Sequence, residues 1–93
     1  MKASESDLFP ERRRMRRARS LRRGRCVFNG GASTLDVTVR DISPGGARIV
    51  GNELVWLPRI FELQIYDSGG AYASREARLK WLKGASAGVE FID

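Results

Sequence analysis

The chain has no histidine, and only one of its 93 residues is cysteine. Histidine is the commonest general base and metal ligand, so its absence removes the usual centre of acid–base or metal chemistry. Cys26 lies in an apolar stretch, which favours an inert buried thiol over a nucleophile. Ser43 has no histidine to activate it, and the scattered carboxylates show no metal-ligand spacing. The sequence therefore predicts no catalytic residue, no metal site and no cofactor, and it argues against an enzyme.

Long hydrophobic runs are also missing. No apolar stretch approaches the roughly 20 residues that a membrane-spanning helix needs, and the first residues lack the apolar centre of a signal peptide. A single cysteine cannot form an internal disulfide, so nothing indicates an oxidising compartment. We therefore expect a cytoplasmic protein without a membrane span. Its length fits one small domain with one modest core.

Acidic residues are scarce at the N-terminal end. Residues 1–25 hold ten basic and three acidic residues, a net charge of +7. Residues 26–93 hold seven basic and eight acidic residues, a net charge of −1. The positive surplus of the chain thus belongs to its N-terminal part. The natural partner for such a segment is phosphate, whether in a nucleic acid, a nucleotide or a membrane headgroup.

The chain divides into three segments by composition. Residues 1–10 are polar and aperiodic, and we expect a flexible N-terminus. Residues 11–23 are dense in arginine, and on a helix Arg13 and Arg17 would repel each other at i, i+4. We therefore expect an irregular arm that becomes ordered when an anion binds. Strand signals start at about Arg22, and residues 24–92 are expected to form a barrel.

Six short runs have the period of two that marks half-buried strands, and turn signals separate them about every ten residues. Asn29-Gly30-Gly31 is a hairpin turn, residues 51–59 form a looser connection, and Tyr66 and Tyr72 flank a turn as cross-strand neighbours. This pattern predicts an antiparallel barrel or sandwich, with closure favoured because a small domain cannot leave long edges open. Besides Cys26, the side chains expected to point inward are Leu35, Val37, Val39, Ala47, Ile49, Phe61, Leu63, Ile65, Ala77, Leu79, Trp81, Ala87, Val89 and Phe91.

The stretch Asp41-Ile42-Ser43-Pro44-Gly45-Gly46 interrupts this alternation. Ile42 is apolar where a polar residue is due, which predicts a bulge or the start of a turn at Asp41. We expect Gly45 and Gly46 to supply unusual backbone angles, and Gly46 to keep side chains away from an approaching ligand. Asp41 and Ser43 project to the same face of an extended segment.

The residue types on that face suit a nucleotide. An aspartate can accept two hydrogen bonds from the N1–H and exocyclic amine of guanine, and Ser43 can reach the same base. Arginine binds phosphate bidentately and stacks on flat rings. Together with the upstream arginines, this turn indicates a site for an anionic ligand that also carries a hydrogen-bonding base.

These residues carry a resemblance to a known family. Arg13-x-x-x-Arg17, followed by Asp41-x-Ser43-x-x-Gly46, resembles the RxxxR and [DN]xSxxG motifs of PilZ domains, which are receptors for the bacterial second messenger cyclic di-GMP. The likeness covers about residues 11–92. It includes the closing run at residues 87–91, which looks like the final strand of the family, and a tryptophan in the strand before it.

The resemblance implies a six-stranded antiparallel barrel, with the RxxxR arm wrapping the ligand at its mouth. It further implies that Arg13 and Arg17, with Arg14 adjacent, contact the phosphates and stack on guanine. Asp41 and Ser43 would read a guanine edge beside Gly46. The spacing of Arg12-x-x-x-Arg16 fits the first motif equally well, but doubled arginines opening the motif look typical of the family.

Two other interpretations stay open. A small-barrel nucleic-acid binder would need several aromatic side chains exposed on one sheet face, and most of the eight aromatics fall on positions expected to point inward. A PilZ-like adaptor that binds no nucleotide is the other. Whether or not such a domain binds the nucleotide, without an output module it is expected to act on a protein effector, which the sequence does not identify. Trp56 is either a loop anchor or a contact for this effector.

Overall fold

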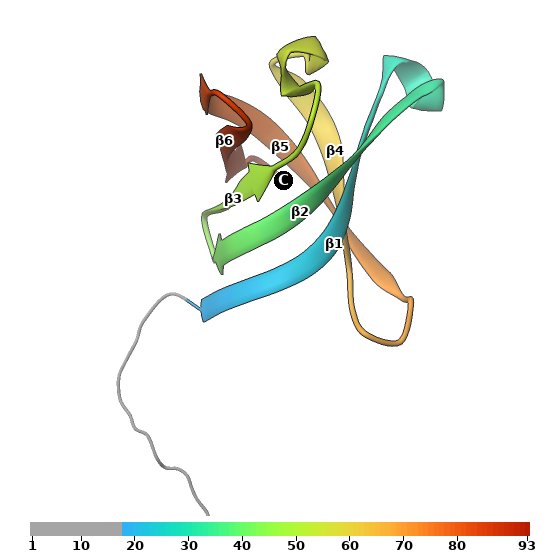
Figure 1. Cartoon of the computed structure of the whole chain (residues 1–93). Helices are drawn as coiled ribbons and strands as arrows, with labels where there is room; N and C mark the ends of the chain where they lie inside the picture. The colour runs from blue at the N-terminus through green and yellow to red at the C-terminus, as the bar shows by residue number, and fades with distance from the viewer. Residues whose placement is uncertain (1–17) are drawn as a thin grey trace, which may run out of the picture.

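The computed structural model describes residues 18–93, which form six antiparallel strands closed into a barrel (Figure 1). The predicted fold class is confirmed. Around the barrel the strands follow the order β1-β2-β3-β6-β5-β4, and β4 pairs with β1 to close it. The strands are β1 (Ala18–Phe28), β2 (Ser33–Ser43), β3 (Gly46–Val50), β4 (Ile60–Tyr66), β5 (Tyr72–Lys83) and β6 (Ser86–Phe91).

The core fills the interior of the barrel. The alternation that the sequence shows along β2, β4 and β6 does place apolar side chains inward, because successive residues of a strand face opposite sides. Cys26 is fully buried, as expected, and the Tyr66 and Tyr72 rings do meet across the β4–β5 hairpin at 5.1 Å. The buried side chains are Cys26, Val37, Val39, Ile49, Leu54, Leu57, Phe61, Leu63, Ile65, Ala77, Ala87 and Val89.

The connections lie at the two ends of the barrel (Figure 1). Two three-residue 3₁₀ turns sit at the upper end in this view: η2 (Asn29–Gly31) joins β1 to β2, and η3 (Leu54–Trp56) lies between β3 and β4. The β4–β5 hairpin lies at the lower end, as do the start of β1 and the β2–β3 turn. The lower end therefore gathers the predicted turn and the entry of the N-terminal segment.

Strand β1 begins at Ala18, earlier than the sequence indicated. The expectation of an irregular arm is wrong for residues 18–23, because the backbone there pairs with β2, with a register shift between Arg19 and Arg22. Pairing with β2 gives the backbone N–H and C=O groups of this segment hydrogen-bond partners. The local sequence of an arginine-rich segment does not reveal such a partner strand. Residues 11–17 of the expected arm, and the expected flexible residues 1–10, lie outside the described residues.

Two register shifts decide which side chains face outward near the predicted turn. Between Val39 and Asp41 the β2–β3 pairing slips, which confirms the bulge predicted at Asp41. Between Leu79 and Trp81 the β5–β6 pairing slips as well, so that two steps along β5 match one step along β6. An extra residue reverses the inward–outward order beyond it. The prediction of a core position for Trp81 is therefore wrong, and its side chain is 45% exposed.

Candidate functional site

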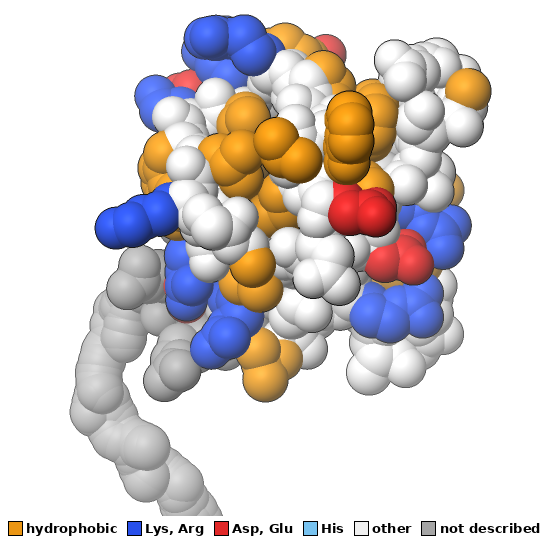
Figure 2. Space-filling model, turned by 45° about the horizontal axis from the view of Figure 1, so that its top comes forward, with side chains coloured by type: hydrophobic (Ala, Val, Ile, Leu, Met, Phe, Trp, Pro, Cys, Tyr) orange, Lys and Arg blue, Asp and Glu red, His pale blue; other side chains and the backbone are white. Residues whose placement is uncertain are grey.

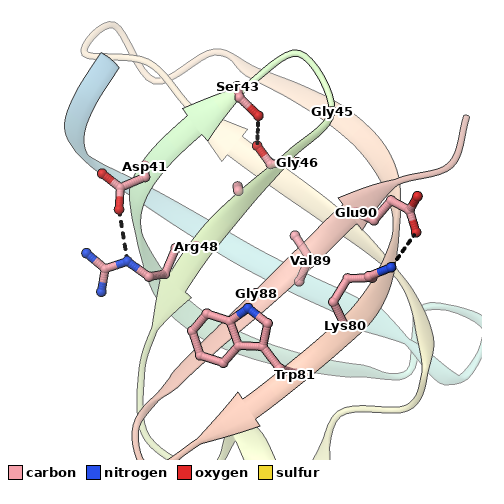
Figure 3. Close-up of a pocket in the computed structure, with 11 residues that line it drawn as sticks. Asp41, Ser43, Gly45, Gly46, Arg48, Lys80, Trp81, Gly88, Val89 and Glu90 are labelled. Carbon is pink, nitrogen blue, oxygen red and sulfur yellow. Dashed lines mark hydrogen bonds and ion pairs between the residues drawn. The ribbon is translucent and has the colours of Figure 1, made fainter. Parts of the chain in front are cut away.

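A cavity of about 480 Å³ opens on the outer surface of the barrel, across β2, β3, β5, β6 and the β2–β3 turn (Figure 3). All three residues of the second predicted motif, Asp41, Ser43 and Gly46, lie at this cavity. The pairing of the strands thus brings this short motif close to residues of β5 and β6, about forty positions further along the chain. The remaining lining residues are Gly45, Ala47, Arg48, Lys80, Trp81, Gly88, Val89 and Glu90.

Asp41 is held against Arg48 by the pairing of β2 with β3. The two residues are register partners just after the bulge, and the Nε of Arg48 donates to Oδ2 of Asp41 at 2.9 Å. The Asp41 side chain is 15% exposed and that of Arg48 is 38% exposed. Because this ion pair is partly buried, it is screened less than a fully exposed pair and holds the carboxylate in a fixed orientation. A carboxylate held in this way is suited to accepting hydrogen bonds from a ligand.

Ser43 ends β2, and its hydroxyl donates to the backbone carbonyl of Gly46 at 3.3 Å. This bond spans the turn and orients the hydroxyl at the rim of the cavity (Figure 3). The hydroxyl oxygen keeps lone pairs that can accept a bond from a ligand. Asp41 and Ser43 therefore present acceptors to the same space, as the sequence predicts.

The prediction of unusual backbone angles at Gly45 and Gly46 is wrong, since neither has a positive φ. Gly46 is needed for another reason. A Cβ there would lie well under 3.0 Å from the backbone carbonyl oxygen of Val89 on the neighbouring strand β6. Gly46 thus allows the backbones of β3 and β6 to approach closely under the cavity.

Trp81 lies over Gly88, on the opposite side of the cavity from Ser43 (Figure 3). A Cβ on Gly88 would lie well under 3.0 Å from the indole Nε1, so the ring rests on bare backbone. Since Trp81 is 45% exposed, part of its indole surface faces solvent at the cavity. The bulge in β5 and the glycine in β6 together create an aromatic surface on the outside of the barrel.

The charges around the cavity balance. Besides the Asp41–Arg48 pair, Glu90 accepts from Arg78 at 3.3 Å and lies 3.6 Å from the Nζ of Lys80. The charged residues that line the cavity are two acids and two bases, so these four side chains alone do not concentrate an anion. An anionic ligand would need additional positive charge from outside this set.

The predicted arginines Arg13, Arg14 and Arg17 lie outside the described residues. The register of β1 nevertheless fixes where the preceding segment joins the barrel. Ala18 is the partner of Ile42, so the chain enters β1 beside the residue that precedes Ser43. The described part of β1 therefore begins beside the strand that carries Asp41 and Ser43.

The sequence interpretation missed five lining residues: Arg48, Lys80, Trp81, Gly88 and Glu90. For Arg48 a signal was present, because it alternates with the inward Ala47 and Ile49 and must face outward beside the motif. The outward position of Trp81 has no local signal, because Ala77, Leu79 and Trp81 alternate without interruption. Only the glycine that faces it on β6 marks the site.

Burial raises the pKa of the Cys26 thiol to about 12, which keeps it protonated and unreactive at neutral pH. In residues 18–93, no group of three or more histidine, cysteine, aspartate or glutamate side chains could hold a metal ion. Within the same residues, no helix has both the length and the apolar character needed to cross a bilayer.

Comparison with known protein families gives a match over most of the chain. The family model of the PilZ domain matches residues 11–93. The match includes the arginine-rich segment as well as every strand of the barrel. A comparison with curated proteins found none that matches the chain.

Proposed function

Because the chain belongs to the PilZ domain family, we propose that it binds cyclic di-GMP at the cavity lined by Asp41, Ser43 and Trp81. PilZ domains are in general receptors for this nucleotide, and they are binding or adaptor domains rather than known enzymes. The observation that carries the proposal is the meeting of Asp41, Ser43 and an exposed indole in one cavity beside the start of β1.

Asp41 and Ser43 supply the base recognition in this proposal. A carboxylate has two acceptor oxygens, which match the paired N1–H and exocyclic amine donors of guanine. The ion pair with Arg48 fixes the carboxylate before the ligand arrives, so that little side-chain freedom is lost on binding. Adenine has no N1–H and cannot offer this pair of donors to the carboxylate, which makes the site selective for guanine.

Trp81 supplies the stacking surface. An aromatic ring offers a base about 1–3 kcal/mol of stacking energy irrespective of sequence. The indole rests on Gly88, so its inner face is packed and its outer part faces the cavity. A base held at its edge by Asp41 and on its face by Trp81 would be fixed in two directions.

The phosphates are assigned to the arginines that precede β1. Because the four charged side chains lining the cavity balance, a doubly charged nucleotide needs the guanidinium groups of Arg13 and Arg17, with Arg14 adjacent. Arginine forms bidentate charge-assisted hydrogen bonds with phosphate oxygens. In this proposal residues 11–17 close over the ligand, and the surface that results is read by a protein effector.

The alternative of a nucleic-acid binder is less favoured by the described surface. Trp56, Tyr72 and Trp81 are exposed, so fewer aromatics point inward than the sequence indicated. However, Tyr72 and Trp81 lie nine residues apart on β5, about 30 Å along an extended strand. They do not form one stacking surface for successive bases. We further propose the bacterial cytoplasm as the site of action, since cyclic di-GMP is a bacterial second messenger.

Calorimetric titration with cyclic di-GMP, GTP and a short DNA duplex tests the proposal, using the parent chain and two variants. Arg17→Ala should weaken binding of every phosphate ligand, by about tenfold to a hundredfold for cyclic di-GMP. Asp41→Ala should weaken cyclic di-GMP by about a hundredfold. The same change removes a negative charge, so weak binding of DNA should hold or rise.

Asp36→Ala is the matched control for Asp41→Ala. Asp36 is also on β2 and is also paired with an arginine, Arg25 at 3.3 Å, but its side chain is 84% exposed and outside the cavity. Cyclic di-GMP affinity should not change in this variant. If Asp41→Ala binds cyclic di-GMP as well as the parent does, this site is not the receptor site. Equal affinity of the parent for all three ligands, falling together with salt, would indicate a nonspecific polyanion binder.

A further inference from the structure

A second cavity, of about 620 Å³, lies on a different part of the barrel surface, between the end of β1 with its η2 turn and strands β4 and β5. It shares no lining residue with the first cavity. Its lining residues are Phe28, Asn29, Gly30, Pro58, Ile60, Phe61, Glu62, Ser74, Glu76 and Asp93. We refer to it below as the acidic groove, because its only charged lining residues are Glu62, Glu76 and Asp93.

Two carboxylates in the acidic groove oppose each other directly. Glu62 on β4 and Glu76 on β5 are register partners in the antiparallel ladder. Side chains at such positions lie on the same face with their Cβ atoms about 5 Å apart, and like charges there destabilise the sheet. The fold itself does not require this arrangement, because an opposite charge or a neutral residue at either position would stabilise the pair.

The repulsion is only partly relieved inside the chain. Ser74 and Gln64 both donate to Oε2 of Glu62, and these bonds, that from Ser74 first, lower the pKa of Glu62 and keep it ionised. The Glu76 carboxylate makes no hydrogen bond or ion pair with any described residue. Asp93 is paired with Arg75 at 3.0 Å, and Arg75 in turn lies over the Phe91 ring. Among residues 18–93, no cation thus forms an ion pair with Glu62 or Glu76.

The groove also has an apolar part. Ile60 is 42% exposed, and Phe28 and Pro58 lie beside it. Figure 2 shows exposed hydrophobic side chains at the upper end of the barrel, with acidic side chains next to Lys and Arg side chains at their right. An apolar surface beside unneutralised carboxylates suits a ligand that has both a cation and an apolar part.

We propose that the acidic groove is the docking site for a protein partner, and that it takes a segment with arginine or lysine side chains next to apolar ones. The cations would lie between Glu62 and Glu76, and the apolar side chains would cover Ile60 and Phe28. Arginine and lysine suit this groove because their aliphatic stems pack on apolar surface while the charged end stays with the carboxylates. This interaction is independent of the nucleotide and would serve to bring the receptor to its effector.

Titration of the full chain with a short synthetic peptide of alternating arginine and leucine tests the proposal, with amide chemical shifts in NMR as the readout. We expect shifts centred on Glu62, Ser74, Glu76 and Ile60. A peptide with glutamate in place of arginine, and one with serine in place of leucine, should not produce them. Glu76→Gln should weaken the arginine–leucine peptide about threefold, and Glu62→Gln with Glu76→Gln should weaken it about tenfold. Glu53→Gln is the matched control, since Glu53 is exposed and outside the groove, and it should have no effect.

Stability separates a docking role from a structural one. Glu76→Gln removes the like-charge repulsion, so the melting temperature should rise while peptide affinity falls. A fall in melting temperature would mean that Glu76 supports the fold, and it would overturn the proposal. If Glu53→Gln weakens peptide binding as much as Glu76→Gln does, the binding is general charge attraction and is not specific to the groove. A dimer in light scattering that Glu76→Gln dissociates, with no peptide binding, would assign the groove to a second copy of this chain.

Discussion

The two cavities differ in how the barrel treats their charges, although β5 contributes to both. Ser74 and Glu76 of β5 line the acidic groove, and Lys80 and Trp81 of the same strand line the cavity proposed above for cyclic di-GMP, referred to below as the nucleotide cavity. In the nucleotide cavity each carboxylate is paired with a base, as in Asp41 with Arg48. In the acidic groove two carboxylates face each other across the ladder. One backbone framework thus carries two surfaces of different chemistry, and function is decided by the side chains placed on it.

The largest effect we predict concerns the backbone beneath the nucleotide cavity. Gly46→Ala should destabilise the barrel by about 1–3 kcal/mol or more, because its Cβ would meet the Val89 carbonyl and the β3 and β6 backbones would have to separate. Chemical denaturation measures the loss. Gly45→Ala is the control, because nothing lies within 4 Å of its Cβ position and its φ is not positive. Equal loss in both variants would place the strain in the turn and not at the strand contact.

The second prediction separates the two exposed tryptophans. Trp81→Ala should weaken cyclic di-GMP about tenfold or more, because a stacking surface is lost. Trp56→Ala removes the same side chain from η3, where it is 71% exposed and outside the nucleotide cavity, and it should leave the affinity unchanged. In the Trp56→Ala protein the remaining indole should change its fluorescence when the nucleotide binds. An unchanged signal, or equal effects of both substitutions, would remove Trp81 from the proposed site.

The bulge at Asp41 could be predicted from the sequence, whereas the bulge at Trp81 could not. Ile42 breaks the local alternation, so the change of face at Asp41 is visible in the chain itself. Along β5 the apolar residues Ala77, Leu79 and Trp81 keep an unbroken alternation, and the reversal arises from the pairing with β6. The need for glycine at position 46 is nonlocal in the same way, because it comes from the close approach of the Val89 carbonyl oxygen on β6. Local pattern predicted the strands and the motif, while contacts between distant strands decided the rest of the cavity.

The third prediction concerns the interior that both cavities share, and it is about how the stability of the barrel depends on pH. Cys26 is fully buried, and burial raises its pKa from 9.0 to about 12. The unfolded thiol therefore loses its proton first as the pH rises, so stability should be unaffected below about pH 9.0 and should fall progressively toward pH 12. Cys26→Ala should lose this part of the pH dependence in parallel melts. Rapid reaction of the native thiol with a labelling reagent at neutral pH would contradict the burial.

The smallest predicted effect concerns communication between the cavities. Glu76→Gln should change cyclic di-GMP affinity by less than about twofold, since Glu76 lies about four residues from Lys80 on β5 and its charge is screened over that distance. Coupling between two binding sites is reciprocal, so peptide affinity should likewise be unchanged by saturating nucleotide. Calorimetric titrations in both orders measure the two values. If each ligand changes the affinity of the other by the same larger factor, strands β5 and β6 have two arrangements, and the barrel itself transmits the signal.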